Sequence, residues 1–294
     1  MGVLSALTVC RNIWQKNWPE VHAAVTSGLP GFVFRSHPQP LGSSVPVFCY
    51  HVVGPQRFQA DLDFLSQNGY VTIDGDTLLD HLTGRRQAPE GAVVLTFDDG
   101  SRNHYEVVFP LLKRHGMKGV AFIAPRFHAY NCNNPLLQPL SWQQIREMHE
   151  SGAIDFQSHT YEHRYLPRWP EPVSLEGSDP EVAESLRGLA LAIREDFRLS
   201  KELLEQKLNK PIRHLAFPRF TGTVEALHIG GECGYEGFWW GVMPHCPDNR
   251  PGQSPNYIVR LRPEFLRRLP GKGRMPLSWV LHEAYRTGHI NILE

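Results

Sequence analysis

Residues 92–100 read Ala92-Val93-Val94-Leu95-Thr96-Phe97-Asp98-Asp99-Gly100, an apolar run that ends in two adjacent aspartates. The run predicts a buried strand, and a turn at Gly100 would present both carboxylates at the carboxyl end of that strand. Active sites of α/β proteins collect at this edge. Two neighbouring carboxylates repel each other, and a bound cation would relieve that repulsion.

Two interpretations of Asp98 and Asp99 stay open at this point. In one, the pair forms an Asx-type turn that closes the strand, with Gly100 supplying permissive backbone angles. In the other, one aspartate binds a metal ion while its neighbour accepts a proton. The pentapeptide 96–100 alone favours neither interpretation.

A second motif follows about sixty residues later, where His159 and His163 are separated by three residues. One helical turn or a tight loop would bring this pair to one side, a spacing that suits two imidazoles on one metal ion. The chain has 15 histidines, so chance pairs are expected. Two histidines combined with an aspartate at another strand end nevertheless favour a metal site with open positions for water and substrate.

Candidate strands and helices alternate along the chain. The strands are expected at 45–51, 92–98, 119–124 and 214–217 and at 237–242, and the helices at 58–68, 105–115, from Ser141 onward, at 179–208 and at 224–233. This alternation predicts parallel strands joined by helices.

Composition limits the class of protein. The chain has 294 residues, 41% of them hydrophobic, enough for one large α/β core. Thirty basic and thirty acidic residues leave a formal net charge of zero, which argues against nucleic acid as the main partner. No basic leader or long apolar segment is evident, so we expect a cytoplasmic protein without a transmembrane segment. The five cysteines are scattered, as expected of free thiols in a reducing compartment: Cys10, Cys49, Cys132, Cys233 and Cys246.

The two motifs, 96–100 and 159–163, together resemble those of the polysaccharide deacetylases, the NodB-homology group also called carbohydrate esterase family four. The likeness covers roughly residues 45 to 265 and implies a distorted (β/α) barrel, often of seven strands. On this basis residues 1–42 are expected to be an N-terminal extension and linker. Residues 43–294 are expected to form the barrel with a C-terminal helical segment.

The resemblance also implies the roles of the motif residues. Asp99, His159 and His163 would be the metal ligands and Asp98 the catalytic base. We expect zinc, although sites of two histidines and an aspartate also accept cobalt, nickel, manganese or iron.

The general acid of this family is a histidine. Residues 48–51 resemble the permuted branch, similar to deacetylases of poly-N-acetylglucosamine, in which this histidine comes first in the chain. We therefore expect His51 as the acid, with His282 as its rival. A histidine at a strand end can point into the barrel mouth, whereas a helical histidine normally faces away.

The segment Ala216-Phe217-Pro218-Arg219-Phe220 resembles the third motif of the family, an aromatic-proline segment near a strand end. The backbone N–H of Arg219 is a candidate oxyanion donor. Arg219 is equally well explained as a binder of a substrate phosphate or carboxylate or as a solvated loop residue. Tyr161 and Trp239 are candidates for stacking on a sugar, although such aromatic residues are more often core. The permuted branch usually has Pro-Tyr-Gly here, whereas in this chain Pro218 is followed by Arg219 and Phe220. We therefore expect the substrate groove to differ in shape from that of the branch. The arginine that steadies the base in the commoner branch is not found, and Arg260 or Arg262 could stand in.

The expected function is metal-dependent removal of an acetyl group from an N-acetylated amino sugar. Two alternatives remain: a C–N hydrolase of the same superfamily acting on a cyclic imide or ureide, and a non-catalytic carbohydrate-binding barrel. A cytoplasmic location would favour a small nucleotide-linked or lipid-linked sugar, the latter with peripheral contact to a membrane. The sequence does not indicate an oligomeric state.

Overall fold

The computed structural model describes residues 28–126, 134–163, 180–243 and 245–290. Parallel strands follow one another around a barrel in the order β1-β3-β4-β5-β6-β7-β8, and β2 pairs with the first residues of β3. The strands are β1 Val47–Tyr50, β2 Val71–Thr72, β3 Ala92–Asp98, β4 Gly119–Ile123, β5 Ile154–Ser158, β6 His214–Ala216, β7 Gly237–Trp240 and β8 Ile258–Val259. The predicted distorted (β/α) barrel with a seven-strand path is confirmed.

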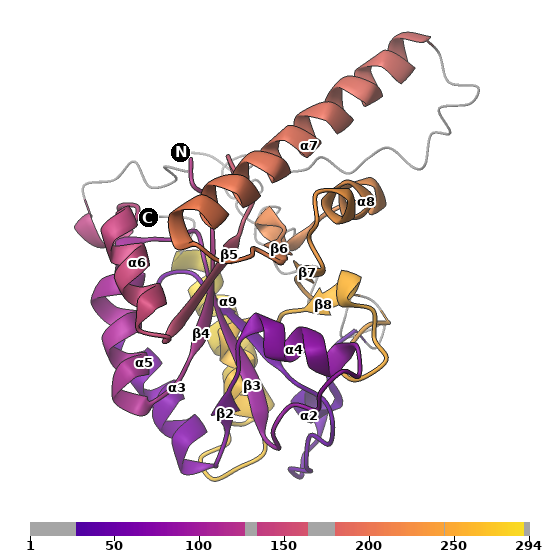
Figure 1. Cartoon of the computed structure of the whole chain (residues 1–294). Coiled ribbons are helices and arrows are strands. Elements are labelled where there is room, and N and C mark those ends of the chain that lie inside the picture. The colour runs from indigo at the N-terminus through magenta and orange to yellow at the C-terminus, as the bar shows by residue number, and fades with distance from the viewer. Residues whose placement is uncertain (1–27, 127–133, 164–179, 244, 291–294) are drawn as a thin grey trace, which may run out of the picture.

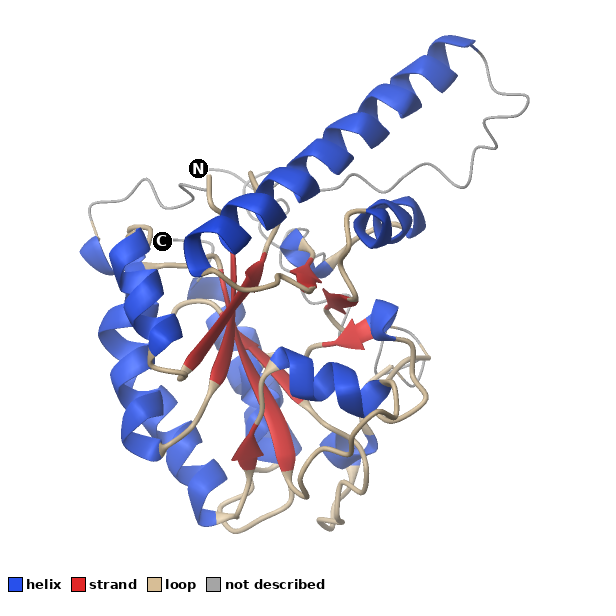
Figure 2. Ribbon diagram, in the orientation of Figure 1, coloured by secondary structure: helices blue, strands red, loops and turns tan. Residues whose placement is uncertain are grey.

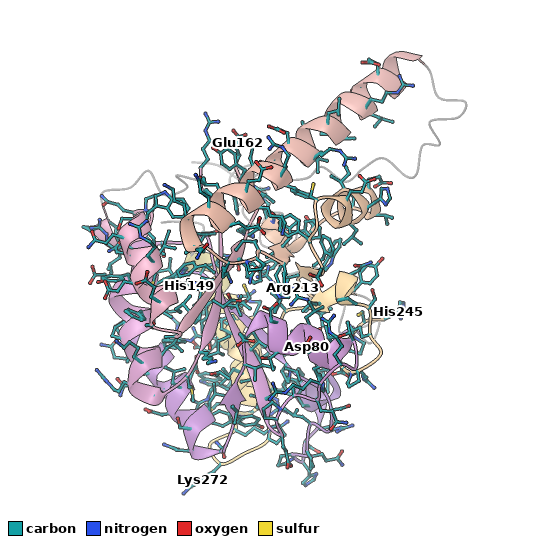
Figure 3. The ribbon with its side chains drawn as sticks, in the orientation of Figure 1. Asp80, His149, Glu162, Arg213, His245 and Lys272 are labelled. Atoms are coloured by element: carbon teal, nitrogen blue, oxygen red, sulfur yellow. The ribbon has the colours of Figure 1, made fainter. Side chains whose placement is uncertain are left out.

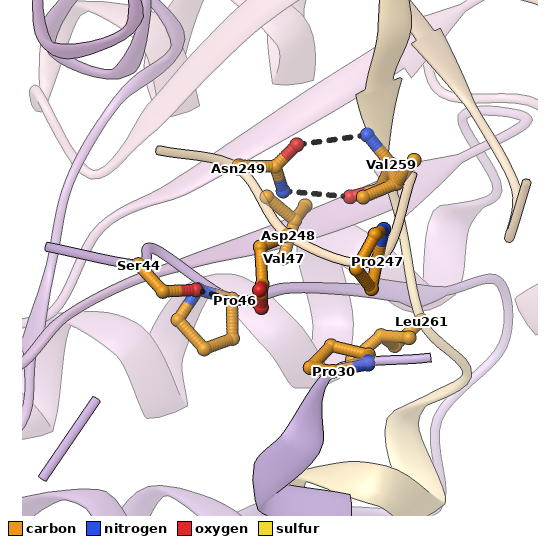
Figure 4. A pocket seen from close by; sticks show the side chains of 9 residues that line it. All are labelled: Pro30, Ser44, Pro46, Val47, Pro247, Asp248, Asn249, Val259 and Leu261. Carbon is orange, nitrogen blue, oxygen red and sulfur yellow. Dashed lines mark hydrogen bonds between the residues drawn. The ribbon is translucent and has the colours of Figure 1, made fainter. Parts of the chain in front are cut away.

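The barrel closes along a seam between its last and first strands. Leu261, two residues beyond β8, exchanges two backbone hydrogen bonds of 2.8 Å with β1. On the same seam the Asn249 side chain accepts a hydrogen bond from the Val259 N–H and donates one to its carbonyl oxygen, both 2.9 Å long (Figure 4). Asn249 also donates to the Val45 carbonyl at 3.2 Å. One buried amide thus joins the two ends of the sheet.

Helices cover the barrel (Figures 1 and 2). They are α2 Gly31–Phe34, α3 Pro55–Gln67, α4 Gly75–Leu82, α5 Phe109–His115, α6 Trp142–Glu150, α7 Pro180–Leu208, α8 Val224–Glu232 and α9 Leu277–Ile290, and a π-helical turn, His104–Val108, precedes α5. The predicted helices are therefore present. Helix α7 is one continuous element of 29 residues, and Figure 1 shows it crossing one end of the barrel and projecting beyond it.

The sequence sets the helix ends locally. Ser141 and Gln144 form a capping box at the start of α6, in which each side chain bonds the other residue's backbone N–H. Helix α5 ends at Gly116, whose φ of 62° is the left-handed conformation that glycine adopts without strain.

Strand residues alternate between the barrel interior and the layer beneath the helices. The interior cluster includes Val94 of β3, Phe122 of β4 and Trp239 of β7, whereas Leu95 belongs to the outer cluster. The same alternation turns Asp98, at the carboxyl end of β3, toward the barrel mouth. An apolar strand thereby delivers one carboxylate into the interior.

The segment before β1 packs against the barrel from residue 28 onward. Phe32 and Val33 are buried, and the guanidinium groups of Arg268 and Arg274 donate to backbone carbonyls of residues 32–36. Part of the predicted extension therefore docks on the body. The division at residue 42 stays a prediction, because residues 1–27 lie outside the described residues.

Two further sequence expectations meet the structure only in part. Cys49, Cys233 and Cys246 are free thiols, while Cys10 and Cys132 lie outside the described residues. Within the described ranges, no helix combines the length and the apolar character needed to cross a membrane. The location of the protein in the cell stays a prediction.

Candidate active site

The predicted site residues meet at the carboxyl edge of the barrel. His51 directly follows β1, Asp98 ends β3 and His159 directly follows β5. Figure 3 shows Glu162, the neighbour of His163, at the end of the barrel that α7 crosses, and Lys272 at the opposite end. The parallel strands thus bring residues from distant parts of the chain to one edge.

Three donor side chains converge there. Asp99 Oδ1 lies 3.3 Å from His163 Nε2 and 3.6 Å from His159 Nε2. Ligand atoms of the three residues all lie within 4.8 Å of one another. Among the residues that the structure describes, this is the one group of three or more such side chains with metal-ligand spacing.

The donor set fits a divalent metal ion. Ligand atoms bound tetrahedrally at zinc distances of ~2.0–2.1 Å lie ~3.3 Å apart, close to the spacings of Asp99 from His163 and His159. His159 Nδ1 lies 2.8 Å from the Ala216 carbonyl oxygen, which can only accept, so Nδ1 carries the proton and Nε2 presents its lone pair to the centre. Burial lowers the pKa of His159 to about 4, which keeps the imidazole neutral, as a metal ligand requires.

The loop that carries the two histidines is held by helix α7. Thr160 and His163 have left-handed backbone conformations, with φ of 65° and 53°. The Asp196 carboxylate, buried on α7, accepts the backbone N–H groups of Tyr161 at 2.8 Å and Glu162 at 3.1 Å. One carboxylate therefore fixes the turn between the two predicted ligands.

Asp98 forms a buried ion pair with Arg260. Arg260 Nη1 donates to both carboxylate oxygens of Asp98, at 2.7 and 3.0 Å, and both side chains are almost completely enclosed. Burial alone would raise the pKa of Asp98, but Arg260, and then His159 and His51, outweigh it and hold that pKa below its ordinary value. Asp98 is therefore ionised at neutral pH and faces His159, whose Nε2 lies 3.8 Å from Asp98 Oδ2.

Arg260, rather than Arg262, contacts the aspartate pair. The Arg260 Nε donates to the Trp240 carbonyl at 3.1 Å, which fixes the guanidinium from a second side. Arg262 turns the other way, toward Glu264 and the Ala284 carbonyl of α9. Of the two arginines that the sequence offered, the structure brings Arg260 to Asp98, the predicted base.

His51 lies beside the aspartates, and its backbone is clamped. His104 Nε2 lies 2.6 Å from the His51 carbonyl, and the Asn103 side chain makes two hydrogen bonds, of 2.9 and 3.0 Å, with the backbone of Val53. Burial would raise the pKa of Asp99, but the hydrogen bond with His163, and then the charge of His51, hold it below its ordinary value, and the charge of His51 also helps to lower the pKa of Asp98. The rival His282 is exposed on α9, where its charge acts on Glu283.

Two of the aromatic residues predicted to contact substrate are buried in the core. Phe217 and Trp239 are 0% exposed, and Trp239 packs inside the barrel on Phe122 and His214. A ring with no accessible face cannot stack on a sugar, so that prediction is wrong for Trp239. Phe217 likewise supports the core.

Other residues of the predicted substrate set remain accessible or adjacent to the site. Pro218 is buried at the start of the loop after β6, Arg219 is exposed next to it, and Tyr161 is partly exposed beside the histidines. Their contact with a substrate stays a prediction.

Comparison with known proteins agrees with this geometry. The family model described as polysaccharide deacetylase matches residues 85–238. This match covers both motifs and more than half of the chain.

The chain belongs to the polysaccharide deacetylase family.

This chain aligns with only part of the length of its relatives in the family. "Putative polysaccharide deacetylase YxkH" of Bacillus subtilis (strain 168) is 24% identical over 202 residues, which are 66% of this chain and 63% of that protein. The "Poly-beta-1,6-N-acetyl-D-glucosamine N-deacetylase" of Staphylococcus epidermidis is 29% identical over 130 residues, 44% of this chain and 41% of that protein. The aligned part is thus less than two thirds of either relative.

Solved structures share the fold. IcaB from Ammonifex degensii superposes with a TM-score of 0.61 at 27% identity, covering 85% of this chain and 99% of that chain. A de-N-acetylase from Aggregatibacter actinomycetemcomitans gives a TM-score of 0.60 at 24% identity, covering 74% and 94%, and at that identity supports the fold alone.

Sequence reasoning missed several residues that shape the site of this deacetylase family member. Asp196 lies in the middle of a long helix, 33 positions after His163, and no local pattern links it to the motif. Asn103 and His104 do follow the aspartate motif at once, so their closeness was a usable signal. In the sequence, Phe220 stands out only as a departure from the Pro-Tyr-Gly pattern of the family branch.

Proposed function

We propose that this protein is a metal-dependent N-deacetylase that hydrolyses the acetamide of an N-acetylated amino sugar to a free amine and acetate. The observation that carries the proposal is the convergence of Asp99, His159 and His163 beside the ionised Asp98. An amide resists water at neutral pH, so its hydrolysis needs both an activated nucleophile and stabilisation of the oxyanion.

Asp99, His159 and His163 would hold the ion, with zinc as the first choice. When bound, such an ion lowers the pKa of a coordinated water to about 7 and polarises a carbonyl. Asp98 would take the proton from the attacking water. Arg260 fixes both of its oxygens, so the base acts from one defined position.

His51 would deliver a proton to the leaving amine. It follows the strand next to that of Asp98, in register with it, since Tyr50 pairs with Phe97. Base and acid would then stand at neighbouring strand ends across the reacting carbon. We assign the oxyanion donor to the backbone N–H of Arg219, which lies three residues after Ala216, whose carbonyl orients His159.

For the substrate, we propose β-1,6-linked N-acetylglucosamine as the first sugar to test. Support comes from relatives such as the Staphylococcus epidermidis protein, whose name gives poly-beta-1,6-N-acetyl-D-glucosamine as its substrate. The smaller nucleotide-linked or lipid-linked sugars predicted from the sequence form the second arm.

The test is acetate release from β-1,6-linked N-acetylglucosamine oligomers, a sugar nucleotide and a lipid-linked N-acetylated sugar. Metal-loaded protein is compared with the same protein after chelation and dialysis. We expect metal-dependent acetate release from at least one arm. Hydrolysis of a cyclic ureide instead would identify another C–N hydrolase. Sugar binding without any hydrolysis would identify a binding barrel, and either result would contradict the proposal.

A further inference from the structure

The loop after β6 holds two consecutive residues in the left-handed backbone region, Arg219 with φ of 54° and Phe220 with φ of 62°. A bulky residue with positive φ is an outlier, and two in succession are rarer still, because the β-carbon crowds the backbone there. Such strain persists only where the surroundings hold it in place, and it clusters at functional sites.

The Phe220 ring contacts His51, the proposed acid, and Arg260, the ion-pair partner of the proposed base Asp98. It meets the His51 ring edge to face, with centroids 5.7 Å apart at an interplanar angle of 80°. The Arg260 guanidinium carbon lies 5.0 Å from its centroid, and Phe122 lies 5.4 Å from that carbon. Edge-to-face rings and a cation over a ring are both attractive arrangements.

The surroundings are shaped for this ring. A β-carbon placed on Gly241 would lie 2.7 Å from Phe220 Cβ, so only glycine leaves room there. The Gly241 N–H also donates to the Phe220 carbonyl at 3.2 Å, and the Phe220 N–H donates to the Phe217 carbonyl at 3.1 Å. The loop is thus held from two sides in a conformation that its own residues disfavour.

From these contacts we propose that Phe220 is a positioning residue for both proton transfers. Its ring fixes the orientation of the His51 imidazole, and it covers Arg260, which keeps water away from the ion pair with Asp98. Exclusion of water strengthens that pair and its hold on the carboxylate. This inference rests on the proposed N-deacetylase function and adds a residue to it.

The kinetic test compares Phe220→Gly with Phe220→Tyr. The glycine variant removes the ring and relaxes the backbone at once, so we expect thermal stability and metal content to be kept while kcat falls about 10²-fold and KM changes far less. The tyrosine variant keeps the ring and should restore most of kcat. Asn209→Gly is the matched control, because Asn209 also has a left-handed φ, of 51°, but is exposed at the end of α7. It should leave kcat unchanged.

A second measurement does not depend on turnover. In spectra of protein with labelled histidine, the ring resonances of His51 are identified by their loss in His51→Gln. We expect Phe220→Gly to shift or broaden them and Asn209→Gly to leave them in place. Unchanged His51 resonances, or wild-type kcat in Phe220→Gly, would overturn the proposal. If the wild type released no acetate at all, the proposed function would fail while the resonances still decided the role of Phe220 in holding His51.

Discussion

The two ends of the barrel each bury a histidine next to carboxylates, but they differ in how many groups converge. At the amino end His214 is fully buried, and its Nε2 lies 3.1 Å from Asp76 Oδ1, on a side chain that is 54% exposed. Asp76 also accepts a hydrogen bond from Arg213, so the charges are balanced in contact with water. At the carboxyl end, His159 faces the buried Asp98, the partly exposed Asp99 and a second histidine.

We expect this difference to separate a structural histidine, His214, from a metal ligand, His159. Asp76 and Arg213 balance each other, and solvent hydrates what remains, so the amino end needs no ion. At the carboxyl end Arg260 pairs with Asp98, while the adjacent Asp99 converges with His159 and His163, and burial keeps His159 neutral. Burial with convergence, rather than the mere presence of histidine and aspartate, marks the functional end.

The largest contrast should appear in turnover. Asp98→Asn keeps an oxygen that accepts from Arg260 but removes the base, so we expect kcat to fall about 10²–10⁴-fold with the metal retained. Asp76→Asn, the same change at the other end, should leave kcat unchanged. Acetate release and metal content are measured on both variants. Wild-type turnover in Asp98→Asn would refute the assignment of the base.

Stability should separate the two ends next. Arg260→Met leaves the Asp98 carboxylate buried without its partner, and we expect a loss of about 3–5 kcal/mol in the free energy of unfolding. Arg213→Met breaks pairs with Asp76 and Glu236, whose side chains are 54% and 47% exposed, and should cost about 1 kcal/mol or less. Urea denaturation measures both, and equal losses would contradict the contrast.

Metal affinity should depend on helix α7. Asp196→Asn weakens the grip on the Tyr161 and Glu162 backbone, and we expect affinity for zinc to fall about 10- to 100-fold. Glu195→Gln alters the neighbouring, exposed carboxylate, which pairs with Arg198, and should bind the ion as the wild type does. Competition with a chelator gives both affinities. An unchanged affinity in Asp196→Asn would show that the histidine loop keeps its conformation without this contact, and would contradict the prediction.

The smallest effect concerns pH at the amino end. The hydrogen bond to His214, with the charges of His214 and Arg213, lowers the pKa of Asp76 to about 2 from 3.8. A carboxyl with a depressed folded-state pKa stabilises the protein above its unfolded pKa and loses that contribution as pH falls toward 2. Asp76→Asn should therefore lower stability by about 1 kcal/mol at pH 6, after allowance for solvent screening, and by progressively less below pH 4. A difference that did not shrink in acid would argue against this ion pair.

Much of the fold was predictable because its signals are local. The apolar run of β3 and the alternation of strands and helices predicted parallel strands joined by helices, with the site at their carboxyl edge. The resemblance of the two motifs to a known family implied the barrel and the donor set. His51 was expected at that edge because residues 48–51 resemble the permuted branch and His51 ends a candidate strand, and the structure places that strand beside β3, in register with it.

What could not be predicted depends on contacts between distant residues. Trp239 reads as an aromatic beside a motif, but the inward alternation of β7 buries it in the barrel. The contact of Asp196 with the histidine loop, and that of Phe220 with His51 and Arg260, arise only when α7 and the loop after β6 are folded over the mouth.

The most direct measurement is metal stoichiometry, by elemental analysis of purified protein after loading with zinc and desalting. The proposed ligand set predicts one ion per chain in the wild type and in Asp76→Asn, and loss of that ion in His159→Ala with the fold retained. A fully metallated His159→Ala, or a wild type that binds no ion, would contradict the assignment of Asp99, His159 and His163 as the metal site.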